Sequence, residues 1–177
     1  IKEAQNKTEI LFKFRDSIYH NHRDYWFKTR AYTHAFACNK IYKREIFKDL
    51  RYPKGKKFED VWLLPNIIQQ CQTIATTTCG YYHYYYNPHG ITATADGMAL
   101  QDLLNAHLKA FEQYQNADYY LSILNVQIDV YNRLKAPILL PYKQYWTSFK
   151  LVLVSCLGVK TTCKIMNLLY KWRQRYR

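Results

Sequence analysis

The adjacent carboxylates Glu59 and Asp60 are the side chains whose position in this sequence best suits acid–base chemistry. They follow a loop, residues 51–57, that carries four cations, a proline and a glycine, and they precede the apolar run 61–64. Acidic side chains favour the first turn of a helix because the helix dipole is positive there. A carboxylate in that position can take a proton from a hydrogen-bonded hydroxyl group. The residues alone favour a simpler interpretation, an ordinary acidic helix start.

Lys40 and His89 are candidates for binding an anion. Lys40 lies in an apolar segment, where its ammonium group could meet a phosphate or an acidic acceptor as a compact charge. It could equally be a surface lysine whose stem lies along apolar neighbours. His89 belongs to the Asn-Pro-His-Gly turn signal at residues 87–90, where it could approach a diphosphate or its metal ion. A solvated turn histidine is the simpler interpretation of this residue.

The tyrosine-rich run 81–86 has the composition of a strand, in which alternate side chains face opposite sides. One face, including Tyr84, could stack on a sugar or a base. Packing in the core is the simpler explanation for most of these rings.

The five cysteines are odd in number and widely spaced. This argues against a disulfide framework and for buried free thiols in a reducing, cytoplasmic compartment. Cys71, Cys79, His83 and His89 are close in sequence but show no C-x2-C or H-x3-H spacing, so they do not predict a metal site.

Three segments occur together in a distinctive order. Residues 39–47 read NKIYKREIF, residues 52–60 read YPKGKKFED, and residues 84–92 read YYYNPHGIT. In this order and at these spacings they resemble motifs from the C-terminal half of family-2 glycosyltransferases, and the resemblance covers about residues 32–94.

The resemblance implies a GT-A fold and inverting transfer of a sugar from a nucleotide-sugar donor to an acceptor hydroxyl, as in surface polysaccharide synthesis. The base of the family is the Asp of a Glu-Asp pair, which here is Asp60, with Glu59 supporting it. Partial desolvation by Trp62 and the tyrosines would raise the pKa of that base toward its working range. The positions expected to contact substrate are Asn39, Lys40, Trp62, Tyr84 and His89.

The family also implies a divalent cation, Mg or Mn, that is held on the donor diphosphate by a D-x-D motif. This sequence contains no D-x-D. Because it also begins at Ile1, we expect a C-terminal piece of a longer enzyme that lacks the metal ligands and has little or no activity alone.

Periodicity predicts the elements that would position these residues. The expected fold class is α/β: the C-terminal part of a GT-A, Rossmann-like fold with few strands at residues 1–95, followed by a basic helical region at residues 96–177. The predicted strands are residues 73–78 and 81–86. The first predicted helices are residues 7–20, residues 43–50, and a helix from Glu59 to Gln70 that Pro65 kinks or delays. Asp96 is the predicted cap of the next helix, which is followed by helices near 121–134 and 142–153, the latter ended by Gly158. The last predicted helix is capped by Thr161 or Thr162.

Positive charge is concentrated at the end of the chain. The net charge is +13, and residues 130–177 hold ten Lys or Arg and no acidic residue. Basic helices that also carry exposed aromatic side chains suit an anionic membrane surface. Within residues 130–177 the longest uncharged stretch, residues 151–159, is shorter than the ~20 residues of a membrane span. A basic tail that packs on its own domain explains the pattern equally well.

The partners that follow are a nucleotide-sugar donor, a saccharide or lipid-linked acceptor, and an anionic membrane surface at residues 130–177. The alternative is a basic, aromatic-rich module without catalysis, which binds single-stranded nucleic acid or a membrane surface. The absence of an RNP-type motif, and the separation of the basic region from the tyrosine run, argue against nucleic acid.

Overall fold

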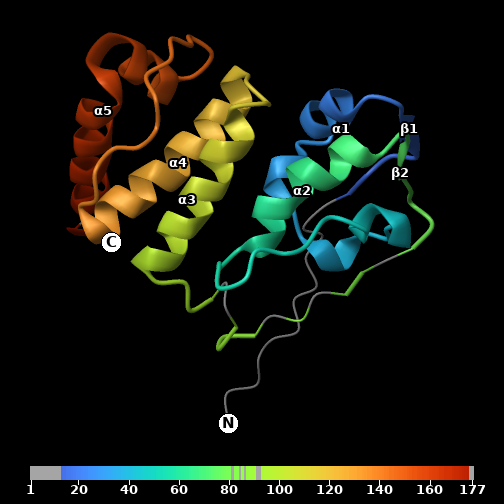
Figure 1. The fold of residues 1–177 in the computed structure, drawn as a ribbon. Helices are drawn as coiled ribbons and strands as arrows, with labels where there is room; N and C mark the ends of the chain where they lie inside the picture. The colour runs from blue at the N-terminus through green and yellow to red at the C-terminus, as the bar shows by residue number, and fades with distance from the viewer. Residues whose placement is uncertain (1–12, 81, 84, 86, 91–92, 176–177) are drawn as a thin grey trace.

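The chain is predominantly helical in a computed structural model, which describes residues 13–80, 82–83, 85, 87–90 and 93–175. Figure 1 shows α3 and α4 side by side at the centre, with α5 next to α4 and α2 next to α3. The elements are β1 (Ser17–Tyr19), α1 (His22–Lys28), the 3-10 turns η1 (Ala31–Thr33), η2 (Ala37–Asn39) and η3 (Arg44–Phe47), α2 (Glu59–Gln70), β2 (Ile74–Thr76), α3 (Gly97–Phe111), α4 (Ala117–Leu134) and α5 (Phe149–Arg175).

The predicted α/β, Rossmann-like fold class is wrong. Of the residues that the structure describes, helices hold 56% and strands only 4%. Within the described residues the sheet consists of β1 and β2 alone, which pair antiparallel with Ile18 opposite Ala75. A Rossmann-like fold requires several parallel strands with helices on both faces, and this strand pair does not provide them.

The sheet also shows why two local predictions failed. Residues 17–19, predicted as the end of a helix, form β1 because they pair with β2, which lies far away in the sequence. The pairing is extended by Asp16, whose carboxylate accepts a hydrogen bond from the Thr78 backbone N–H at 2.6 Å. In the run 81–86, the described Tyr82, His83 and Tyr85 lie in no strand, and the other three positions lie outside the described residues.

The helices with clear start signals are where the sequence predicts them. Asp96 caps α3 by accepting a hydrogen bond from the Ala99 N–H at 2.8 Å. The helix predicted near residues 121–134 is α4, which begins earlier, at Ala117, because Asn116 caps it in the same way through the Tyr119 N–H at 2.7 Å. The predicted helix from Glu59 to Gln70 is α2, and it continues through Pro65. The predicted helix at residues 43–50 is the short 3-10 turn η3.

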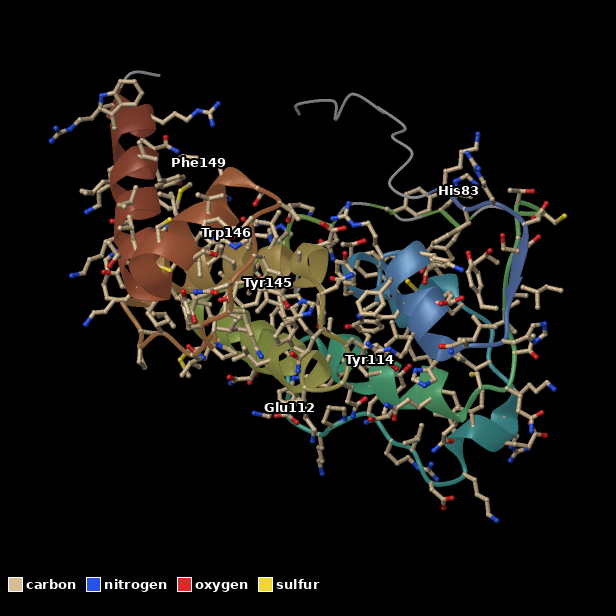
Figure 2. All side chains as sticks on the ribbon, turned by 90° about the horizontal axis from the view of Figure 1, so that it is seen from above. His83, Glu112, Tyr114, Tyr145, Trp146 and Phe149 are labelled. Carbon is tan, nitrogen blue, oxygen red and sulfur yellow. The ribbon has the colours of Figure 1, made fainter. Side chains whose placement is uncertain are left out.

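A cluster of aromatic side chains forms the centre of the core. Trp26 of α1 stacks on Tyr114 with ring centroids 4.5 Å apart, and its edge meets Tyr119 of α4 at 5.4 Å. Tyr32 contacts Tyr119 with ring centroids 4.5 Å apart and Trp26 with centroids 6.0 Å apart. All four rings are buried. One core therefore contains residues from both sides of position 95. Figure 2 shows Tyr114 near the middle of the molecule.

The last helix, α5, contains a break at Gly158, where φ is 77° and ψ is 165°. The predicted stripe at residues 142–153 is helical only from Phe149 onward. Thr161 and Thr162 lie inside the helix, and the Thr162 hydroxyl donates to the Gly158 carbonyl at 2.9 Å.

Among the described residues, α5 is the one helix whose length and composition would allow it to cross a membrane, although core helices of soluble proteins pass the same test.

Candidate functional site

The candidate base, Asp60, lies in the first turn of α2, as the sequence predicts. The preceding residue, Phe58, has a left-handed backbone with φ of 58°, which is uncommon for a residue other than glycine. This turn leads the cationic loop directly into the helix. The Asp60 carboxylate accepts a hydrogen bond from the Val61 backbone N–H at 2.8 Å.

The environment of Asp60 favours its protonated form. Burial raises the pKa of its carboxyl group, and the negative charge of Glu59 raises it further. The Val61 N–H and the Lys40 ammonium oppose this shift, but the net direction is upward. A general base works best when its pKa approaches the working pH, so the shift is in the direction that catalysis needs.

Lys40 is a half-buried cation with every N–H group engaged. Its Nζ donates to the carbonyl oxygens of His34 at 2.7 Å and Phe36 at 2.8 Å, and to Asn39 Oδ1 at 2.6 Å. Burial lowers the pKa of Lys40 to about 8. An ammonium group has three donors. An anion could therefore bind Lys40 only by displacing one of these oxygens.

Lys40 also interacts electrostatically with Asp60, since each shifts the pKa of the other. The two are not an ion pair, because no such pair within 4.0 Å is found for them among the described side chains. The cation and the half-buried carboxylate therefore share a site without a direct bond.

A cleft of about 840 Å³ lies beside this pair. Its walls are the segment 39–43, the second half of α2 and the strand β2 with its flanking threonines. The α2 residues on this wall include Leu64, Ile67 and Ile68, which follow Asp60 by four, seven and eight positions. Residues at these spacings share one helix face. Asp60 does not line the cleft, but it lies on the same face, one turn before it.

Two tyrosines complete the site and were not singled out in the sequence. Burial raises the pKa of Tyr42, and the nearby charge of Asp60 adds to the shift. The pKa of Tyr52 rises for the same two reasons. The rings of Tyr42 and Tyr52 each contact Phe47, with centroids 5.5 Å and 6.2 Å away. Tyr42 belongs to the segment 39–47 and Tyr52 to the segment 52–60. The sequence motifs that contain them could therefore have identified both tyrosines.

The remaining predicted site residues are not gathered around Asp60. Trp62 follows Asp60 by two positions, roughly 200° around the helix, and its ring faces the Lys56 ammonium, 5.7 Å from the ring centroid. His89 is exposed in a turn closed by the Gly90 N–H and the Asn87 carbonyl at 2.9 Å. Tyr84 lies outside the described residues. Asn39 lines the cleft beside Lys40.

No group of three or more His, Cys, Asp or Glu side chains that could hold a metal ion is found in the described parts of the chain.

Comparison of the chain with protein-family models, with curated proteins and with solved structures finds no match.

Proposed function

We propose that this chain forms the acceptor side of an inverting glycosyltransferase, in which Asp60 is the catalytic base. The observation that carries the proposal is the half-buried Asp60 carboxylate with a raised pKa, on the helix face that lines the cleft. The three segments that resemble family-2 glycosyltransferases give this carboxylate its proposed role.

In this reaction an acceptor hydroxyl oxygen attacks the anomeric carbon of the donor sugar. The bond between that carbon and the diphosphate breaks, and the hydroxyl proton moves to Asp60. The Lys40 cation stabilises the resting carboxylate, while burial and Glu59 make Asp60 basic enough to accept the proton. Glu59 and Lys40 are positioning residues here, because they act through Asp60.

The chain supplies the acceptor side only. A nucleotide-sugar donor and its Mg or Mn ion require carboxylate ligands of the D-x-D type, and neither the sequence nor the described side chains provide them. The expected acceptor is a saccharide, free or lipid-linked.

A nucleic-acid-binding role has less support. Single strands bind to exposed aromatic side chains that lie in a basic groove. In this chain Trp26, Tyr32, Tyr114, Tyr119 and Tyr120 are instead buried in the core. The exposed Trp146, Phe149 and Trp172 lie near basic residues but do not line the cleft.

Acceptor binding can be tested directly on the 177-residue chain. We expect a panel of oligosaccharides and alkyl glycosides to shift the backbone NMR signals of residues 39–42 and of the first turn of α2. Asp60→Asn should weaken that binding about tenfold, because a hydrogen bond from a hydroxyl group to a charged acceptor contributes roughly 1.5 kcal/mol.

The matched control is Asp118→Asn. Asp118 is also the second residue of its helix, α4, but it is exposed and far from the cleft in sequence. The proposal fails if none of the saccharides perturbs these signals, or if the Asp60 and Asp118 variants bind equally well.

A further inference from the structure

The second part of α5, residues 159–175, has three distinct sides. Its packed side carries Val159, Thr162, Cys163 and Asn167, all of them buried. Asn167 anchors this side by donating a hydrogen bond from Nδ2 to Oδ1 of Asn132 in α4. The helix is therefore fixed to the molecule along one side, and the other two sides face outward.

An apolar stripe runs along the first outward side. Ile165, Leu168, Leu169 and Trp172 are spaced by three, four and seven positions, so they share one helix face. Leu168 is 66% exposed, Leu169 47% and Trp172 63%. Large apolar side chains that are this exposed indicate a surface that binds another apolar surface, such as a protein or a membrane.

A cationic stripe borders the apolar one. Lys160, Lys164, Lys171 and Arg175 are all exposed. At roughly 100° per residue, they occupy the helix side between the packed side and the apolar stripe. Within the described chain, no carboxylate lies at ion-pair distance from any of these four cations. No acidic residue follows Asp129 in the sequence.

The break at Gly158 and the cations decide how such a helix meets a bilayer. Gly158 breaks α5, and the helix continues after it as a separate part from Val159 to Arg175. Four of its cations lie in one row along the helix, so a span would place them inside the hydrocarbon core. A helix that lies in the plane of the interface keeps the cations with the headgroups and buries the apolar stripe.

We propose that residues 159–175 form a docking face for an anionic lipid bilayer, with the helix parallel to the membrane plane. Leu168 and Trp172 enter the boundary between headgroups and acyl chains, and the lysine row contacts anionic headgroups. The combination of an apolar stripe with a row of cations selects an anionic lipid surface as the partner, because such a surface offers both an apolar phase and negative headgroups. The proposal is independent of the role of Asp60.

Other exposed aromatics lie at the same end of the molecule. Trp146 is 63% exposed and Phe149 is 69% exposed. Figure 2 shows both residues beside α5, at the end opposite His83. The α5 end therefore combines apolar exposure with the most basic part of the sequence, while the cleft near Asp60 is built from α2, β2 and the segment 39–43.

The experiment is co-sedimentation of the full chain with vesicles of phosphatidylcholine alone or mixed with phosphatidylglycerol. We expect binding to the anionic vesicles only, and loss of that binding when salt rises from about 0.05 M to about 0.5 M. Absence of binding to anionic vesicles at low salt would overturn the proposal.

Two charge-reversal variants show whether vesicle binding depends on the α5 face or only on the net charge of the chain. Reversal of three lysines in the row (K160E/K164E/K171E) should weaken vesicle binding at least ~10-fold. The control reverses three exposed lysines outside α5 (K48E/K54E/K109E), giving the same net charge, and should bind within about threefold of the wild type. Equal losses in the two variants would contradict a docking face on α5. Circular dichroism verifies that both variants keep the helical content of the parent.

A third variant distinguishes a membrane from a nucleic acid. Leu168→Gln combined with Trp172→Gln keeps every cation but removes the apolar stripe. We expect it to lose most vesicle binding, and to leave any weak binding to a single-stranded oligonucleotide unchanged. Wild-type vesicle binding by this variant would mean that the face is purely electrostatic, and it would sink the proposal.

Discussion

Asp60 and Lys40 interact electrostatically without a direct hydrogen bond, and substitution of Lys40 tests this interaction. The Lys40 cation lowers the pKa of Asp60 against the larger effect of burial. Lys40→Met removes that cation, so the pKa of Asp60 should rise further above the usual value of an aspartate. Carboxyl carbon-13 NMR titration of Asp60 measures the change.

Lys48→Met is the control for this experiment, because Lys48 is exposed and is not among the groups that shift the pKa of Asp60. An unchanged Asp60 titration in the Lys40 variant would show that the two charges are not coupled.

The position of the Asp60 carboxylate could be predicted from the sequence, but the residues that surround it could not. Glu59 and Asp60 were predictable because acidic first turns follow a local electrostatic rule. Tyr42 and Tyr52 were not singled out, since their proximity to Asp60 depends on how the chain folds between residues 42 and 60. Trp62 was predicted to desolvate Asp60, but helix geometry turns it to another side of α2.

At the scale of elements, Gly158 decides the shape of α5. Its φ of 77° is strained for any residue with a Cβ atom, although the space around that position is open. We therefore expect Gly158→Ala to destabilise the chain by about 1–2 kcal/mol, measured by urea unfolding.

The comparison variant for Gly158 is Cys156→Ala, at an exposed position in the same helix. It should change the free energy of unfolding by less than ~0.5 kcal/mol. A Gly158→Ala variant as stable as the parent would show that α5 can straighten through this position.

Elements with local signals were predicted, and elements that depend on distant partners were not. Asp96 identified α3 because a cap acts within one turn. By contrast, residues 17–19 show a helical period together with their N-terminal neighbours, yet they pair with residues 74–76. The fold class failed for the same reason, because a sheet is decided by partners that periodicity does not reveal.

At the scale of the whole molecule, a buried histidine makes stability depend on pH. Burial lowers the pKa of His107 to about 4, whereas in the unfolded chain it is about 6.5. Between these values the unfolded state binds more protons, so stability falls as pH decreases from about 6.5 to about 4. The His107 contribution to this loss is about 2–3 kcal/mol. The pKa of His34 is also lowered by burial and acts in the same direction.

His107→Leu should remove most of that contribution. Urea unfolding at about pH 7 and about pH 4.5 should show a drop in stability smaller by ~2 kcal/mol than in the parent. The same drop would be expected in His89→Leu as in the parent, because His89 is exposed in its turn. An undiminished drop in the His107 variant would contradict the buried, neutral state.

The aromatic cluster has a consequence for how this gene can change. Trp26 comes from before position 95, whereas Tyr114 and Tyr119 come from after it, and the three rings pack in one cluster. A recombination event near residue 95 would replace part of this cluster with rings selected against other partners. We therefore expect residues from α1 to α4 to be inherited as one unit, and the exposed surface of α5 to change more freely than the segments on either side of that junction.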